Sequence, residues 1–219
     1  MIVAKNIFKS YQNQAVLSDC NFLGSNSKLI AILGASGSGK STFLNILGGI
    51  EQPDKGTISI NGKIYSTLKD KEQAEIRNKQ IGFVFQEHRL LPELSALENV
   101  LLPVRIANES ISEAKKRAQG LFEILGVDGL ENKMPAELSG GEKQRFAVAR
   151  ALINEADTIL ADEPSGALDN KNAENLLDLF LSVRDKLSKT IIFVTHNETL
   201  AAKSDEIWRM NDGQLSREN

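Results

Sequence analysis

The chain has 219 residues, and its 26 lysines and arginines against 29 aspartates and glutamates give a formal charge of −3 at pH 7. A charge this small disfavours a basic surface for nucleic acid, so we expect no nucleic-acid partner. The single cysteine, Cys20, excludes a disulfide within the chain and favours a cytoplasmic protein. We find no apolar stretch typical of a secretory signal and no run of roughly 20 apolar residues that would span a bilayer.

The first part of the chain reads as β-structure. Residues 1–33 are consistent with short strands and polar turns, and they end in the apolar run LIAIL before a glycine-rich loop that opens a helix. The segments TISI and KIY flank Asn61-Gly62, which suits a type I′ turn because both central residues of that turn need positive φ. We therefore predict a β-hairpin over residues 57–65, followed by a strand over residues 81–85.

The rest of the chain alternates between helices and strands. Residues 88–137 are rich in Leu, Ala, Glu and Lys and are interrupted by prolines and glycines, which indicates several helices. Next come a predicted helix over 140–153, a strand over 158–161, a helix over 172–186 and a strand over 190–195. This alternation is typical of βαβ units with a parallel sheet, so the predicted fold class is α/β.

The loop GASGSGKST matches the phosphate-binding pattern G-x-x-x-x-G-K-[ST] between a buried strand and a helix. In such a loop the backbone N–H groups surround phosphates, Lys40 reaches the β- and γ-phosphates, and the Ser41 hydroxyl ligates Mg²⁺. A turn that merely caps a helix would match the full pattern in about one chain of this size in a hundred. The predicted nucleotide-binding residues are Gly34, Ala35, Ser36, Gly37, Ser38, Gly39, Lys40, Ser41 and Thr42.

Two carboxylates, Asp162 and Glu163, follow the apolar run TILA. They therefore stand at the carboxyl end of a predicted strand, where open α/β sheets bind ligands. Because successive side chains of a strand point in opposite directions, we assign Asp162 to Mg²⁺ and Glu163 to the base that polarises the attacking water. Without the phosphate loop, the same pair would be interpreted as the acidic start of a helix near Pro164.

Three further residues have roles that their own surroundings leave open. Gln86 ends the run IGFVF and His196 ends TIIFVT, so both lie at strand ends. A glutamine can coordinate Mg²⁺ and a neutral histidine can orient water, although isolated residues of either type are usually structural. Tyr11 either packs on the core or stacks on a base.

A second glycine-rich element, LSGGE, precedes a strong helical pattern. Ser139 and Glu142 match a capping box, and the helix N-terminus offers free N–H groups to an anion. Capping alone leaves Gly140 and Gly141 unexplained, because each glycine in a helix costs up to about 1 kcal/mol. The pair indicates close approach of the backbone to a ligand, so we expect both glycine-rich elements to share one nucleotide.

Together these motifs resemble the ATP-binding cassette (ABC) transporter ATPases over nearly the whole chain. GASGSGKST is similar to the family's Walker A motif, ILADE to its Walker B, LSGGE to its signature and SGALD to its D-loop. Gln86 and His196 stand where that family has its Q-loop glutamine and switch histidine. The resemblance implies an ATPase that uses Mg²⁺, in which Tyr11 stacks on adenine. It also implies metal contacts from Ser41, Gln86 and Asp162, catalytic roles for Glu163 and His196, and a D-loop containing Asp169.

The resemblance also implies one ABC ATPase domain over residues 1–219. Residues 1–86 and 155–219 would form a P-loop NTPase core with an N-terminal antiparallel β-subdomain, and residues 87–154 an inserted helical subdomain. Two copies would pack head to tail, so that the signature of one copy closes over the ATP bound by the other copy. The signature residues are Ser139, Gly140, Gly141 and Glu142. The helical subdomain would meet separate membrane permease subunits, which would place the chain at the cytoplasmic face of the membrane.

Within this family, the segment over residues 86–104 and the run LNILGGIEQP look most like the lipoprotein-releasing and macrolide-exporter ATPases. The sequence departs from that branch at SGALD, where TGNLD is usual, and at Glu87. One alternative is a soluble mechanical ABC-type ATPase acting on DNA or ribosomes, which would carry a long coiled-coil insertion or a second cassette. Another is a P-loop GTPase, whose N-K-x-D motif is incomplete at residues 170–173, or a P-loop kinase, which would leave LSGGE unexplained.

Overall fold

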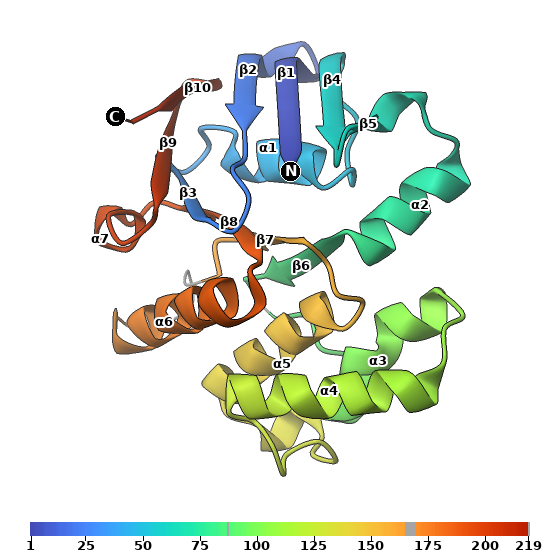
Figure 1. The fold of residues 1–219 in the computed structure, drawn as a ribbon. Coiled ribbons are helices and arrows are strands. Elements are labelled where there is room, and N and C mark those ends of the chain that lie inside the picture. The colour runs from blue at the N-terminus through green and yellow to red at the C-terminus, as the bar shows by residue number, and fades with distance from the viewer. Residues whose placement is uncertain (87, 165–169, 219) are drawn as a thin grey trace.

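The structure is a computed structural model that describes residues 1–86, 88–164 and 170–218. Its strands form an antiparallel sheet with the order β2-β1-β4-β5 and a second, mostly parallel sheet with the order β10-β9-β3-β8-β7-β6 (Figure 1). The first sheet comprises β1 (Ile2–Tyr11), β2 (Gln14–Leu23), β4 (Lys55–Ile60) and β5 (Lys63–Ile64). The second comprises β3 (Leu29–Leu33), β6 (Ile81–Phe85), β7 (Thr158–Asp162), β8 (Thr190–Thr195), β9 (Glu206–Asn211) and β10 (Gln214–Arg217).

Helix α1 (Lys40–Leu47) lies between the two sheets (Figure 1). Its buried Phe43 shares one hydrophobic core with Phe22 of β2 and Ile32 of β3, and the Phe22 and Phe43 rings meet edge to face with their centroids 6.0 Å apart. The antiparallel sheet therefore covers α1 from above, while one face of the parallel sheet supports it from below. This packing holds the loop that precedes α1 at the end of β3.

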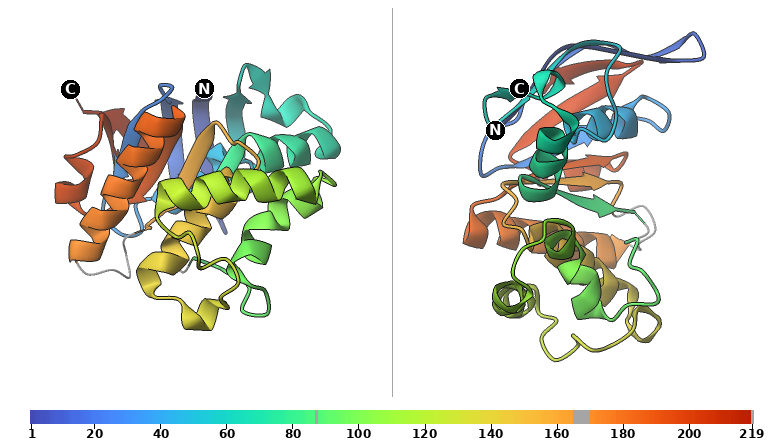
Figure 2. Two further views of the ribbon diagram at one scale, coloured as in Figure 1. Left: turned by 60° about the horizontal axis from the view of Figure 1, so that its bottom comes forward. Right: turned by 90° about the vertical axis from the view of Figure 1, so that its right-hand side faces the viewer.

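A second hydrophobic core covers the other face of the parallel sheet. Helices α3 (Ala96–Ile106), α4 (Ile111–Leu125) and α5 (Gly140–Leu152) lie together, with α6 (Asn170–Leu187) beside them (Figure 2). Edge-to-face contact between Phe122 and Phe146, with ring centroids 5.3 Å apart, joins α4 to α5. The shorter helices are α2 (Asp70–Lys79) and α7 (Glu198–Ala201). Within the described ranges, no helix combines the length and the apolar character needed to cross a bilayer.

Strand register brings the ends of four strands to one edge of the parallel sheet. Leu33 of β3 lies opposite Thr195 of β8, and Phe85 of β6 lies opposite Asp162 of β7. Because these strands are parallel, the residues that follow them emerge together, which is where α/β sheets bind ligands.

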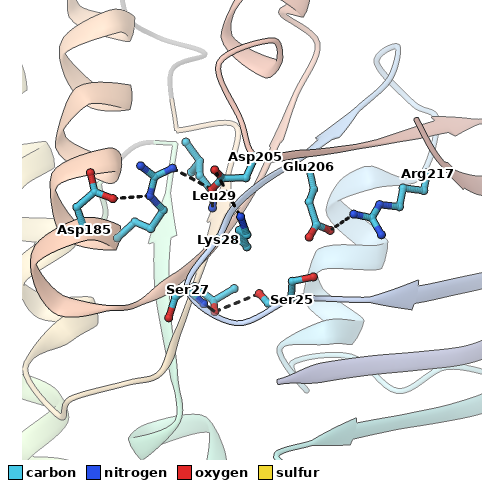
Figure 3. Close-up of polar contacts among 10 residues, drawn as sticks. Ser25, Ser27, Lys28, Leu29, Asp185, Asp205, Glu206 and Arg217 are labelled. Carbon is cyan, nitrogen blue, oxygen red and sulfur yellow. Dashed lines mark hydrogen bonds and ion pairs between the residues drawn. The ribbon is translucent and has the colours of Figure 1, made fainter. Parts of the chain in front are cut away.

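The opposite edge of the sheet is tied by polar contacts (Figure 3). There, Asp205 Oδ2 accepts hydrogen bonds from the Leu29 N–H at 2.7 Å and from Arg184 Nη1 at 2.9 Å. Arg217 of β10 pairs with the buried Glu206 of β9 at 3.4 Å. These contacts fix where β3 starts and hold the final strand, so the phosphate loop extends from an anchored strand.

The predicted hairpin is confirmed, because Ser59 pairs with Ile64 and because Asn61 and Gly62 have φ of 48° and 80°. The predicted helices and strands from residue 140 onward agree with the structure to within two residues at each end. The prediction of short strands in residues 1–33 is wrong for β1 and β2, which have 10 residues each. Register shifts between these strands, with positive φ at Asn6 and Asp19, break the alternation of buried and exposed residues that would reveal long strands.

Candidate active site

The glycine-rich loop over residues 34–39 folds tightly between β3 and α1. The Gly34 N–H donates to the Thr195 carbonyl at 3.2 Å, and the Ser38 N–H donates to the Ala35 carbonyl at 3.2 Å. Gly37 has a φ of 78° with nothing near its missing Cβ, so its backbone conformation alone favours glycine. The loop therefore leaves β3 while hydrogen-bonded to the neighbouring strand β8, and it turns back on itself before α1.

Two other glycines of the loop are required by close packing. A Cβ on Gly34 would lie 2.4 Å from the Met210 carbonyl oxygen of β9. Gly39 has a φ of 104°, and a Cβ there would lie 2.9 Å from the Val16 carbonyl oxygen of β2. The loop thus lies directly on the backbones of β2 and β9, and the sequence pattern alone did not reveal those supports.

Lys40 extends back over the loop and is only 4% exposed. Its Nζ donates to the Ala35 carbonyl at 2.8 Å and lies 3.7 Å from Glu163 Oε1. An ammonium group held above loop backbone in this way supplies a fixed positive charge for a phosphate.

Ser41 and Asp162 meet although they are far apart in sequence. The Ser41 Oγ donates to Asp162 Oδ1 at 2.7 Å. Both atoms are hard oxygen ligands of the kind that Mg²⁺ prefers. In the described part of the chain, no group of three or more His, Cys, Asp or Glu side chains could hold a metal alone. Mg²⁺ is usually bound by one or two protein oxygens together with waters and substrate phosphates, and Ser41 and Asp162 could supply such oxygens.

Glu163 lies between Lys40 and His196. Its Oε2 is 3.5 Å from His196 Nδ1, while its Oε1 faces Lys40. The backbone of Glu163 has a φ of 39°, an unusual value for a residue with a side chain. A carboxylate beside a cation and an imidazole, at the edge where phosphates would bind, is placed to take a proton from water.

Gln86 follows β6 at the same edge, but the structure does not bring it into contact with Ser41 or Asp162. Its side chain is exposed and forms no hydrogen bond with any described residue. The position agrees with the sequence-based expectation, whereas the metal contact stays a prediction. Asp169 lies outside the described residues.

Tyr11 ends β1 with its ring 43% exposed, so it is not packed into the core. Its hydroxyl donates to Glu51 Oε1 at 2.5 Å, and Lys9 Nζ lies 5.4 Å from the ring centroid. Partial burial raises the Tyr11 pKa, the Glu51 carboxylate acts in the same direction, and the Thr42 hydroxyl opposes them. The exposed ring does not fit packing in the core, so stacking on adenine stays the prediction for Tyr11.

A hollow of about 460 Å³ lies beside the phosphate loop. Residues 14–16, 35–38 and 210–213 line it, and Tyr11 pairs with Gln14 at its border. Its size falls in the range of small-molecule sites. Sequence reasoning missed residues 14–16 and 210–213, because neither segment carries a motif and only the fold brings them together.

The signature element forms the predicted capping box at the start of α5. Glu142 Oε2 accepts hydrogen bonds from the Ser139 N–H at 2.7 Å and from its Oγ at 2.8 Å. These hydrogen bonds lower the pKa of Glu142, and the bond from the Ser139 backbone has the larger effect. A Cβ on Gly140 or Gly141 would meet no atom within 4 Å. The close approach that the glycines predict is therefore not made by any described residue of this chain.

The phosphate loop and the signature belong to different parts of the molecule. The loop precedes α1 between the two sheets, whereas α5 lies with α3 and α4 on the far side of the parallel sheet (Figures 1 and 2). The two elements of one chain thus lie apart, and the sharing of one nucleotide by both elements stays a prediction.

Comparison with known proteins decides the family. Residues 17–166 match the ABC transporter family. The chain belongs to the ABC transporter family. The α/β fold and the ATPase class predicted from the motifs are thereby confirmed, and the kinase and GTPase interpretations are excluded.

Relatives of this ABC ATPase match it along its whole length. The lipoprotein-releasing system ATP-binding protein LolD of Bacteroides thetaiotaomicron is 47% identical over 218 residues, 100% of each chain. The protein of the same name from Cytophaga hutchinsonii is 46% identical, with 98% of each chain covered. The dimeric structure of MJ0796, described as a bacterial ABC transporter cassette, has a TM-score of 0.88 at 38% identity and covers 100% of this chain and 98% of its own. A post-hydrolysis dimer of MJ0796 bound to ADP and Pi has a TM-score of 0.87 at 37% identity, with the same coverage.

Proposed function

We propose that this ABC ATPase is the ATP-hydrolysing subunit of a lipoprotein-releasing transporter and that it energises separate permease subunits. The observation that carries hydrolysis is the placement of Glu163 between Lys40 and His196, at the sheet edge that also holds Ser41 and Asp162. The observation that favours lipoprotein release is 47% identity, along the full length, to a protein named for that system.

In this function the chain's own groups divide the chemistry. Loop N–H groups and the Lys40 ammonium bind the phosphates, and the Glu163 carboxylate accepts the proton of the attacking water. His196 lies beside Glu163 and helps to orient that carboxylate and the water. Ser41 and Asp162 would hold Mg²⁺, and Gln86 would be a further ligand in the closed state. The bound Mg²⁺ would stabilise the charge on the transferring phosphoryl group.

Two copies of the chain would enclose the ATP. Gly140 and Gly141 are open to solvent and so leave room for the phosphates held by the partner's loop. The N-terminus of α5, with Ser139 as its cap, presents free N–H groups and a positive dipole to them. MJ0796 is described as dimeric, which supports the pairing of two copies of this chain, and Asp169 of the D-loop belongs to the same proposed site. Hydrolysis removes the anion that joins the two faces, so the faces separate.

The permease would dock on a groove between the core and the helical part of the chain. The groove holds about 310 Å³, and Phe83 of β6 and Leu102, Pro103 and Ile106 of α3 provide much of its apolar wall. Ile106 is 73% exposed and borders this apolar wall, and a contiguous exposed apolar surface is typical of a protein-interaction site. Within a single domain over residues 1–219, residues 87–154 would then be the subdomain that meets the permease, holding the chain at the cytoplasmic face of the membrane.

Capture of partners from native membranes tests this function. Glu163→Gln protein, which should trap ATP, is isolated with Mg-ATP, and its companions are identified by mass spectrometry. A permease with few membrane spans and a large domain outside the membrane would support lipoprotein release, which is then assayed with the reconstituted complex. A permease with many spans would indicate ordinary substrate translocation, and absence of any membrane partner would favour the soluble mechanical ATPase.

A matched pair of variants tests the docking groove. Ile106→Glu places a charge in the groove and should abolish permease capture. Leu23→Glu changes another exposed apolar residue, on β2 and 52% exposed, and should leave capture unchanged. Equal capture by both variants would refute docking at this groove while leaving the ATPase assignment intact.

A further inference from the structure

Arg150, near the end of α5, is a partly buried cation whose hydrogen bonds go to the segment formed by His88 and Arg89, shortly after Gln86 in the chain. Its Nη2 donates to the His88 carbonyl at 2.7 Å, and its Nη1 donates to the Arg89 carbonyl at 2.6 Å. Burial lowers the pKa of its guanidinium. Over residues 1–86, 88–164 and 170–218, no carboxylate forms an ion pair with it, so these two carbonyls are the acceptors that the described chain offers.

The segment that Arg150 holds has an unfavourable backbone conformation. His88 and Arg89 have φ of 60° and 47°, so two consecutive residues with side chains lie in the left-handed region. Charge-assisted hydrogen bonds to both carbonyls stabilise this conformation. The Arg89 guanidinium lies 4.2 Å from the centroid of the Phe85 ring on β6. The segment is therefore fixed to β6 through a side chain and to α5 through its backbone.

A second contact joins the same segment to α5. Gln144 is only 2% exposed and lies beside the His88 imidazole. Burial lowers the pKa of His88, and the Gln144 amide acts in the opposite direction. Nδ1 of His88 and both amide atoms of Gln144 are buried without a hydrogen bond to the described chain. The segment is thus packed against α5 through the His88 side chain as well as through its backbone.

We propose that Arg150 is a positioning residue that couples Gln86 to the signature. Helix α5 has 13 residues, begins at the signature and ends just after Arg150, so its two ends move as one rigid body. When the signature closes over nucleotide, Arg150 carries the segment after Gln86 with it and turns Gln86 toward the metal site. This inference rests on the proposed ATP-driven closure and adds the connection by which closure reaches Gln86.

The matched control for Arg150 is Arg145 on the same helix. Its Nη1 also donates to a backbone carbonyl, that of Leu125 at 2.7 Å, which belongs to the end of α4 rather than to the Q-loop. Arg150→Met and Arg145→Met thus remove equivalent hydrogen bonds with different destinations. Arg150→Lys keeps the charge and restores part of the contact, which provides a second folded variant if Arg150→Met is unstable.

The test measures nucleotide affinity, kcat and the Mg²⁺ concentration for half-maximal ATPase activity in the permease complex. Arg150→Met should bind ATP as the wild type does, because the phosphate loop is untouched. Its kcat should fall about 10- to 100-fold, the range expected when a catalytic group is misplaced, and its Mg²⁺ requirement should rise. Arg150→Lys should recover part of this loss, and Arg145→Met should match the wild type in both measurements.

A double-mutant cycle identifies the route of the effect. If Arg150 acts through Gln86, adding Arg150→Met to Gln86→Ala should lower kcat little further. Full additivity, or an unchanged Mg²⁺ requirement in Arg150→Met, would overturn the coupling while wild-type activity upholds the proposed function. Absence of ATPase activity in the wild-type complex would instead overturn the proposed function together with this inference.

Discussion

Replacement of Glu163 by glutamine tests the assignment of the catalytic base. The carboxylate is 3.7 Å from Lys40 Nζ and 3.5 Å from His196 Nδ1, with a side chain 25% exposed. Glutamine keeps the size and polarity of glutamate but cannot accept a proton at neutral pH. We therefore expect Glu163→Gln to bind ATP and dimerise, yet to hydrolyse ATP far more slowly.

The expected size of the loss follows from the role of a general base. Such assistance contributes about 10²- to 10⁴-fold, which corresponds to roughly 2.7 to 5.4 kcal/mol of activation free energy. The ion pair with Lys40 is long and partly solvated, so its loss should change the free energy of unfolding by about 1 kcal/mol or less. Reduced kcat with nearly unchanged stability would distinguish a catalytic role from a structural one.

Phosphate release measures kcat, equilibrium binding of a fluorescent ATP analogue measures affinity, and urea unfolding measures stability. Glu155→Gln, which changes an exposed carboxylate just beyond α5, is the control and should behave as the wild type does. A kcat for Glu163→Gln within tenfold of the wild-type value would refute the assignment of Glu163 as the base.

Three further predictions follow from the same geometry. Lys40→Ala should weaken ATP binding and turnover, because it removes the ammonium held over the loop, and undiminished affinity in an equilibrium titration would contradict that role. Gly141→Ala should stabilise the isolated chain by up to about 1 kcal/mol in urea, since its Cβ meets nothing, yet should impair ATP-driven dimerisation measured by gel filtration in the Glu163→Gln background. Burial, with Lys143 and Arg150, lowers the His88 pKa below its usual 6.5, so the unfolded chain binds more protons and stability falls as pH drops through 6.5. His88→Asn, which tolerates the positive φ, should lose less stability than the wild type between pH 7.5 and 5.5, and equal losses in urea titrations would argue against a buried neutral imidazole.

Local features of this protein could be read from its sequence. The loop before α1, the hairpin turn at Asn61-Gly62 and the capping box at Ser139 each depend on φ angles or hydrogen bonds among close neighbours. Helix α2 and strand β10 are not predicted from the sequence, because prediction depends on a local apolar pattern. Ile76 is the buried residue of α2, and β10 has no buried residue, so neither segment has a readable apolar pattern.

The contacts that make a site from these motifs depend on tertiary structure. The hydrogen bond between Ser41 and Asp162 spans 121 residues, and that between Tyr11 and Glu51 spans 40. The first pairing follows from a sheet order that places β8 between β3 and β7, and the second brings the end of β1 to the segment after α1; no local pattern specifies either arrangement.

The contacts of the signature glycines and of Arg150 also depend on the tertiary structure. The sequence predicts that Gly140 and Gly141 approach a ligand, whereas the structure shows open space beside both residues, so the contact with a second chain stays a proposal. Arg150 lies in an ordinary helical pattern and meets the His88 carbonyl 62 residues away only because α5 packs beside β6. The sequence alone indicates which groups are candidates for the chemistry, because phosphate-binding turns and helix caps are local structures. Their relative positions came from burial of two cores on opposite faces of one sheet, which is a property of the whole chain.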